Sequence, residues 1–197
     1  MKFYFAAAEQ PESHSAAFDS AQYNMKKTES DSAVQAARKG KTMQIRRAMS
    51  KDIPGILKLL VQVDMVHHNG RPDLFKGPAT KYNAEELEQL MADDTAPVFV
   101  CTEGDAVLGH AFCIQKQEKN NAVLTDIKTL YIDDICVDET MRGRHIGRML
   151  YEHVLSYARE NGFYNITLNV WTCNPGAMKF YETLGLKPQK IGMEMIV

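Results

Sequence analysis

The stretch Val137-Asp-Glu-Thr-Met-Arg-Gly-Arg-His-Ile-Gly-Arg-Met-Leu150 decides the fold of this chain. An apolar segment runs into a short basic loop, and the loop runs directly into an amphipathic helical pattern. The first backbone N–H groups of a helix lack partners within the helix and carry the positive end of its dipole, so they bind anions. Two glycines that permit close backbone approach and three arginines that pair with phosphate strengthen the pattern: Gly143, Gly147, Arg142, Arg144 and Arg148. The stretch therefore predicts a phosphate-binding loop.

The loop differs from two well-known nucleotide-binding loops, because it has neither a Gly-Lys-Ser/Thr triplet nor three spaced glycines. It resembles instead the acyl-CoA loop of the GNAT N-acetyltransferase superfamily, Arg/Gln-x-x-Gly-x-Gly/Ala. The pattern here is Arg142-Gly-Arg-His-Ile-Gly147, with His145 in place of the first patterned glycine. The resemblance implies that the loop holds the pyrophosphate of acetyl-CoA. The implied contacts are Arg142, Gly143, Arg144, His145, Ile146, Gly147 and Arg148.

A second block, from Asn174 to Gly185, is similar to the later GNAT motif of Asn, Ala and Phe-Tyr-x-x-x-Gly. The matching residues are Asn174, Ala177, Phe180, Tyr181 and Gly185. The resemblance implies that Tyr181 is the general acid, which protonates the leaving CoA thiolate. It also implies that Asn174, Ala177 and Phe180 lie along the cofactor. The structural alternatives are a half-buried packing role for Tyr181 and a helix N-cap for Asn174.

The amine acceptor of such an enzyme must lose a proton before attack, because alkylammonium groups titrate near about 10. The resemblance implies an acidic base on the strand before the loop, and by its spacing from Arg142 this is Asp133. Neighbouring side chains of a strand point to opposite faces, so we expect only one of Asp133 and Asp134 to face the site. The alternatives are an exposed strand edge or an ion pair with a basic helix residue.

The same strand supplies backbone groups. In the family, the pantetheine arm pairs with strand backbone and the thioester carbonyl accepts an N–H, which the resemblance places at Ile135, Cys136 and Val137. Cys136 is also the nearest candidate for a covalent route, but no activating base is visible near it in the sequence. We therefore expect direct attack of the amine in a ternary complex.

The order of apolar periodicities predicts an α/β fold with a central mixed, mostly antiparallel sheet and helices on both faces, as in the GNAT fold. A hairpin is expected at Gly104-Asp105 and a capping box at Asn83 and Glu86. Expected strands are 43–49, 98–101, 106–114, 123–137, 165–170 and 191–197. One expected helix opens within 50–54, with Ser50 or Asp52 as its cap, and the others span 83–93, follow the loop from 146, and span 175–184.

Composition limits the remaining choices. The 197 residues are 45% hydrophobic with a net charge of −2, which favours neither nucleic acid nor membrane as a partner. Residues 1–42 are polar and are expected to be a disordered extension, and residues 43–197 a single domain. Four scattered cysteines show no metal spacing and predict reduced thiols in a cytoplasmic protein. No apolar run is long enough to span a bilayer, and the short apolar start does not predict secretion.

The sequence thus predicts an N-acetyltransferase that moves an acetyl group from acetyl-CoA to a primary amine of a small molecule or peptide. The alternatives are a non-catalytic acyl-CoA-binding or sensing module on the same fold, motivated by His145, and an interaction protein whose polar tail recruits a partner. Such folds also permit a homodimer, and no metal is expected. The expected acceptor segment is mildly basic, which hints at an amine that also bears a carboxylate: His67, His68, Arg71 and Lys76, with Trp171 as a wall.

Overall fold

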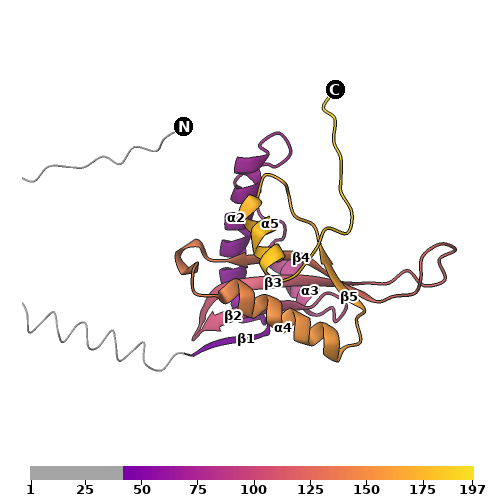
Figure 1. The fold of residues 1–197 in the computed structure, drawn as a ribbon. Helices are drawn as coiled ribbons and strands as arrows, with labels where there is room; N and C mark the ends of the chain where they lie inside the picture. Colours follow the sequence, from indigo (N-terminus) through magenta and orange to yellow (C-terminus); the bar gives the residue numbers. More distant parts are fainter. Residues whose placement is uncertain (1–41) are drawn as a thin grey trace, which may run out of the picture. The chain divides into compact units, whose positions relative to one another are not determined.

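The computed structural model describes residues 42–197. The helices of this part of the chain surround a central β-sheet (Figure 1). The strands lie in chain order, β1 to β5, and only the last pair, β4 and β5, is parallel. The mixed, mostly antiparallel sheet is therefore confirmed. The strands are β1 (Met43–Arg47), β2 (Val98–Glu103), β3 (Ala106–Lys116), β4 (Thr129–Val137) and β5 (Asn165–Leu168).

Helices cover both faces of the sheet. The helix α4 (Ile146–Glu160) packs on one face, and α2 (Ile53–Gly70) with α3 (Ala84–Met91) packs on the other. The strand β2 shows why two layers form, since Phe99 and Cys101 enter the α4 cluster while Val98 and Val100 enter the α2 cluster. The short helices are η1 (Ser50–Asp52), η2 (Glu139–Met141) and α5 (Pro175–Thr183).

Two predicted local motifs are confirmed. Gly104 turns the β2–β3 hairpin with φ +63°, a left-handed conformation that glycine adopts without steric cost. Before α3, the Asn83 side chain accepts the Glu86 N–H at 2.9 Å, and the Glu86 carboxylate accepts the Asn83 N–H at 2.8 Å. At the start of α2 the prediction was wrong in detail. Asp52 occupies the N-cap position, but its carboxylate binds Arg46 and the Met49 N–H instead of capping the helix.

The strand expected at 123–137 begins only at Thr129. Side chains in the preceding loop satisfy its backbone locally, because Asn121 accepts the N–H groups of both Val123 and Leu124 at 2.9 Å. Such bonds compete with a sheet ladder. The strand expected at 165–170 likewise ends at Leu168.

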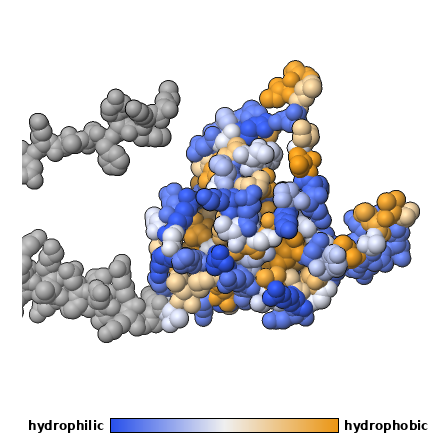
Figure 2. All heavy atoms as spheres, viewed as in Figure 1, coloured by the Kyte–Doolittle hydropathy of each residue, from blue (hydrophilic) through white to orange (hydrophobic). Residues whose placement is uncertain are grey.

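The strand expected at 191–197 is absent from the described part of the chain, where this segment is exposed and pairs with no other strand. A segment with alternating apolar residues forms a strand only if its backbone can pair with a neighbouring strand. Here the segment is held instead by a side chain, since the Glu194 carboxylate accepts hydrogen bonds from the Arg71 guanidinium. Figure 2 shows hydrophobic surface, in orange, at the C-terminal end and, separately, at the tip of the β3–β4 hairpin. The exposed apolar side chains are Val123, Leu124 and Ile127 on the hairpin and Ile191, Met193, Met195, Ile196 and Val197 at the end.

Candidate functional site

The loop between β4 and α4 has the geometry of an anion site. Asp138 ends the strand and accepts the backbone N–H of Thr140 at 3.0 Å and its hydroxyl at 2.7 Å, which starts η2. Gly143 then adopts φ +79° and His145 φ +60°, two left-handed turns that bring the chain to the first residue of α4. The side chain of the N-cap residue His145 does not cap this helix, which leaves the first N–H groups for a ligand.

His145 occupies the position where the family pattern has a glycine, and its left-handed backbone explains the pattern. Histidine is among the residues that tolerate this conformation, whereas a β-branched residue does not. Gly147 contributes to the packing of α5. A Cβ atom there would lie 3.3 Å from the Phe180 ring, so its absence lets α5 pack closely on the start of α4.

The three loop arginines differ in their partners. Arg144 donates to the Glu103 carboxylate at 3.0 Å, and Arg148 lies 3.7 Å from the Glu152 carboxylate one turn along α4. Arg142 is exposed and forms no ion pair with any residue from 42 to 197. Its positive charge is therefore the least compensated of the three by the protein itself.

The carboxylates on β4 do not follow the expected alternation. Phe112 lies opposite Asp134 and Cys113 opposite Ile132, so Asp133 is an extra residue, a β-bulge. A bulge interrupts the alternation of faces. Asp133 contacts the ammonium of Lys81 before α3, and Asp134 contacts a histidine in the α2 layer. The bulge places both carboxylates on the side of α2 and α3, so alternation does not separate them as expected, and which of the two serves the site stays a prediction.

That histidine is His110 on β3, whose Nε2 lies 2.8 Å from Asp134 Oδ2. Its ring is fully buried and packs edge-on against Phe112, with the ring centroids 4.9 Å apart. Sequence analysis missed it, although a histidine at an alternating position of an apolar strand was a visible signal. Lys81, the partner of Asp133, was missed as well, because the loop that brings it to β4 has no periodic pattern.

Tyr181 belongs to α5, and the charge of Asp134 acts on its hydroxyl. Burial raises the pKa of Tyr181, and the negative charge of Asp134 raises it further, so the hydroxyl stays protonated at neutral pH. Asn174 fixes the start of α5 by accepting the Ala177 N–H at 3.1 Å. The N-cap alternative for Asn174 is thereby confirmed. Phe180 lies beside Tyr181 and against Gly147, which ties α5 to the phosphate loop.

Beyond Ile132 the strand β4 leaves its parallel neighbour. The β4–β5 pairing covers Thr129–Ile132 and Asn165–Leu168, whereas β4 continues to Val137. Between Asp133 and Val137 the edge of β4 that faces away from β3 therefore pairs with no strand in residues 42–197. This free backbone edge includes the residues that were expected to pair with a pantetheine arm: Ile135, Cys136 and Val137.

Cys136 is unsuited to covalent chemistry. Burial and the nearby charge of Asp134 raise its pKa to about 12, so it is a thiol at neutral pH. Its sulfur lies 3.6 Å from the Leu59 carbonyl oxygen, in the layer of α2.

The expected acceptor segment is engaged internally. Arg71 binds the carboxylates of Asp73 and Glu194, and His68 Nδ1 lies 2.8 Å from the Phe75 carbonyl oxygen. Phe75 in turn packs edge-on against Trp171, with centroids 5.2 Å apart. Because Arg71 already binds two carboxylates of the protein, the structure does not support the prediction that this segment binds an acceptor with a carboxylate.

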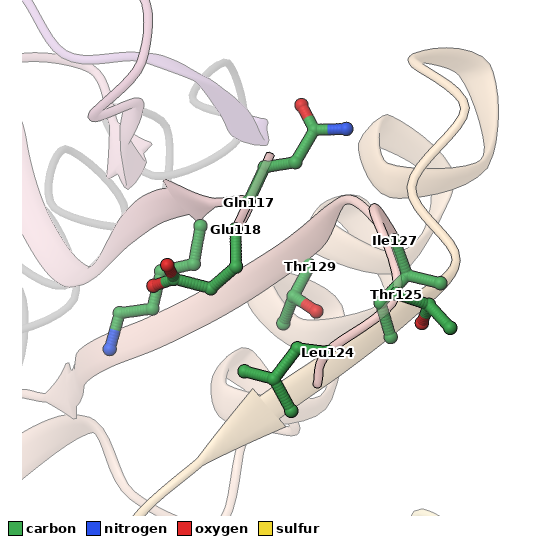
Figure 3. A pocket seen from close by; sticks show the side chains of 7 residues that line it. Gln117, Glu118, Leu124, Thr125, Ile127 and Thr129 are labelled. Carbon is green, nitrogen blue, oxygen red and sulfur yellow. The ribbon is translucent and has the colours of Figure 1, made fainter. Parts of the chain in front are cut away.

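A shallow hollow of about 190 Å³ lies elsewhere, at the base of the β3–β4 hairpin (Figure 3). No residue that lines it belongs to the phosphate loop, to the carboxylates of β4 or to α5. The hollow is thus separate from the candidate site. Its lining is Lys116, Gln117, Glu118, Leu124, Thr125, Ile127 and Thr129. Residues 42–197 hold no group of three His, Cys, Asp or Glu side chains placed to bind a metal, and none of their helices has the length and apolar character to cross a bilayer.

Comparison with known proteins agrees with this geometry. The pattern of the Acetyltransferase (GNAT) family matches residues 64–186. The chain is 28% identical over 155 residues to an uncharacterized N-acetyltransferase, MJ1207, of Methanocaldococcus jannaschii; the match covers 77% of this chain and 63% of that protein. The chain therefore spans less than two thirds of the relative's length.

Solved structures show the same fold. A single-residue variant of the BH1408 protein from Bacillus halodurans is 30% identical with a TM-score of 0.75, covering 78% of this chain and 99% of that one. Glucosamine-6-phosphate N-acetyltransferase from Arabidopsis thaliana is 21% identical with a TM-score of 0.59, covering 79% of this chain and 98% of that one. The predicted GNAT fold is confirmed by these similarities.

Proposed function

Since this chain belongs to the acetyltransferase (GNAT) family, we propose that it transfers an acetyl group from acetyl-CoA to a primary amine of a small molecule or peptide. The amine attacks directly in a ternary complex. The observation that supports the proposal is the backbone edge of β4 left unpaired among residues 42–197, which leads through the left-handed turns at Gly143 and His145 into the N-terminus of α4. We place the acid at Tyr181, the base at Asp134 and the anion site at the start of α4.

Acetyl-CoA supplies the activated acetyl thioester. Arg142 and the first N–H groups of α4 hold its pyrophosphate, with backbone from Gly143 to Gly147 around it. Arg144 and Arg148, though paired, add positive potential from the surface. The pantetheine arm lies along the free edge of β4 at Ile135, Cys136 and Val137, and the residues that flank it from α5 are Asn174, Ala177 and Phe180.

We assign the base to Asp134 in preference to Asp133. The contact with Lys81 compensates the charge of Asp133, whereas Asp134 is the carboxylate whose charge acts on Tyr181. Asp134 takes the proton of the attacking amine, directly or through water, as its C–N bond forms. The C–S bond of the thioester breaks, and the thiolate takes the proton of Tyr181. Proton transfer through solvent then restores both side chains.

The test measures CoA thiol release from acetyl-CoA with peptides, polyamines, amino acids and aminoglycosides. In the Tyr181→Phe and Asp134→Asn variants we expect kcat to fall about 10²-fold or more, while the Kd for acetyl-CoA stays unchanged. Asp133→Asn should cost less, and the matched control Tyr164→Phe removes an exposed hydroxyl without effect. Tight acetyl-CoA binding without transfer to any amine would favour the non-catalytic module instead.

We also propose that residues 43–197 act as a single domain without the extension 1–42. Residues 42–197 form one compact unit, which supports this boundary. A chain that begins at Met43 should keep the kcat and melting temperature of the full chain, and loss of folding on truncation would contradict the boundary. A cytoplasmic, reducing location is proposed on the same footing, since all four cysteines are free.

A further inference from the structure

His110 is a titratable group to which the proposed mechanism gives no role. It has 0% relative exposure, and on the sheet it lies opposite Val100 and packs against Phe112, two residues of the apolar cluster in the α2 layer. A polar side chain buried so completely needs a compensating partner. The only partner of His110 among residues 42–197 is the carboxylate of Asp134, at 2.8 Å from Nε2. The pair therefore joins the core of the α2 layer directly to the proposed base.

The hydrogen bonds fix which ring nitrogen carries the proton. An ionised carboxylate can only accept, so Nε2 must be the donor toward Asp134 Oδ2. Nδ1 is buried and has no partner among the described residues. An unpaired buried N–H is costlier than an unpaired lone pair, so Nδ1 carries the lone pair. The ring therefore donates one hydrogen bond, from Nε2 to Asp134.

We propose that His110 is a positioning residue for acetyl transfer, whose Nε2–H fixes the orientation of the Asp134 carboxylate. The hydrogen bond occupies Oδ2 and leaves Oδ1 as the oxygen for the acceptor amine. This inference rests on the proposed function, because it assigns the base to Asp134. His110 itself touches neither acetyl-CoA nor the amine.

The surroundings of Asp134 make its donor matter. Burial and the charge of Asp134 raise the pKa of Tyr181 in α5 and of Cys136 in β4, and both stay protonated at neutral pH. Lys81 and the neighbouring carboxylate of Asp133 are paired with each other. His110 is therefore the only identified side chain that donates a hydrogen bond to Asp134 in residues 42–197. Without it, no identified donor among these residues fixes which oxygen of the Asp134 carboxylate is left for the acceptor amine.

The test compares His110→Leu, which removes the donor at similar volume, with His110→Gln, whose amide restores a donor near Nε2. We expect His110→Leu to lower kcat about 10- to 100-fold, less than loss of the base itself, with the Kd for acetyl-CoA unchanged. His110→Gln should recover most of the lost kcat. The control His153→Leu removes a histidine on the α4 face and should change neither kcat nor the Kd.

Several results would overturn the inference. One is a folded His110→Leu enzyme with the wild-type kcat; another is an equal loss of kcat in the Leu and Gln variants, which indicates packing alone. If Asp134→Asn retains full kcat, the assignment of Asp134 as the base fails. If Asp134→Asn is inactive but His110→Leu keeps full kcat, only the role of His110 fails. The nitrogen NMR shifts of His110 at pH 7.5 give a readout without turnover, and a proton found on Nδ1 would also refute the proposal.

Discussion

Replacing Asp138 by Asn tests how the start of the phosphate loop is stabilised. Asp138 has 5% relative exposure and closes β4. Its carboxylate accepts the Lys58 ammonium of α2 at 2.9 Å and both the N–H and the hydroxyl of Thr140. These contacts, the Lys58 hydrogen bond first, lower the pKa of Asp138 from 3.8 to about 2. An asparagine keeps an acceptor for Thr140 but loses the charge that Lys58 requires.

The magnitude follows from the pKa. One pKa unit corresponds to about 1.4 kcal/mol, so a fall from 3.8 to about 2 gives at most about 2.5 kcal/mol. The Lys58 side chain is 68% exposed, and water screens its share of the interaction. We therefore expect Asp138→Asn to lower the free energy of unfolding by about 1–2 kcal/mol at pH 7.

The pH dependence has a defined sign. The folded pKa lies below the unfolded pKa, so the stabilisation is complete above pH about 4 and disappears as the pH falls through about 2. Urea unfolding of both proteins should show a gap at pH 7 that narrows toward pH 2. The Lys58→Met variant and the double variant complete a cycle for the pair. Equal stability of wild type and Asp138→Asn at pH 7, or strict additivity in the cycle, would refute the reasoning.

Three further outcomes are expected. Arg142→Ala should weaken the Kd for acetyl-CoA about 10- to 100-fold by calorimetry, because a charge-assisted hydrogen bond is worth about 1.5–3 kcal/mol; an unchanged Kd would contradict the phosphate assignment. Gly143→Ala should cost about 1–2 kcal/mol in urea unfolding, because φ is +79° although nothing lies within 4 Å, whereas Gly192→Ala should be neutral. In alkylation followed by mass spectrometry, exposed Cys173 should react at pH 8 and Cys136, with a pKa of about 12, should not; rapid labelling of Cys136 would show that its pKa is lower.

Much of the fold could be predicted because its signals are local. The Asn83 capping box, the Gly104 hairpin and the loop before α4 each depend on a few neighbouring residues, and the structure has all three. The apolar periods likewise located α2 and α4 and the buried strands β2 and β3. Each element is specified by contacts that lie close in the sequence, which a pattern can represent.

The failures depend on pairing between distant segments. Residues 191–197 have a strand pattern but no neighbouring strand among the described residues, and nothing in the segment reveals this. The partners of Asp133 and Asp134 were equally hidden, because Lys81 is 52 residues away and His110 is 24 residues away in the sequence. The carboxylates themselves were identified from the sequence; what each one binds was not.

The bulge on β4 links these observations to the proposed chemistry. Strict alternation would place one carboxylate in the α4 layer, whose core side chains are apolar, where a charge would lack compensation. One extra residue keeps both on the other face, where each finds a different partner, an ammonium for Asp133 and an imidazole for Asp134. An ammonium compensates the negative charge of a carboxylate, whereas an imidazole that donates one hydrogen bond orients the carboxylate. Two adjacent aspartates thus acquire different proposed roles through their partners, one as a tether for the loop before α3 and the other as a base.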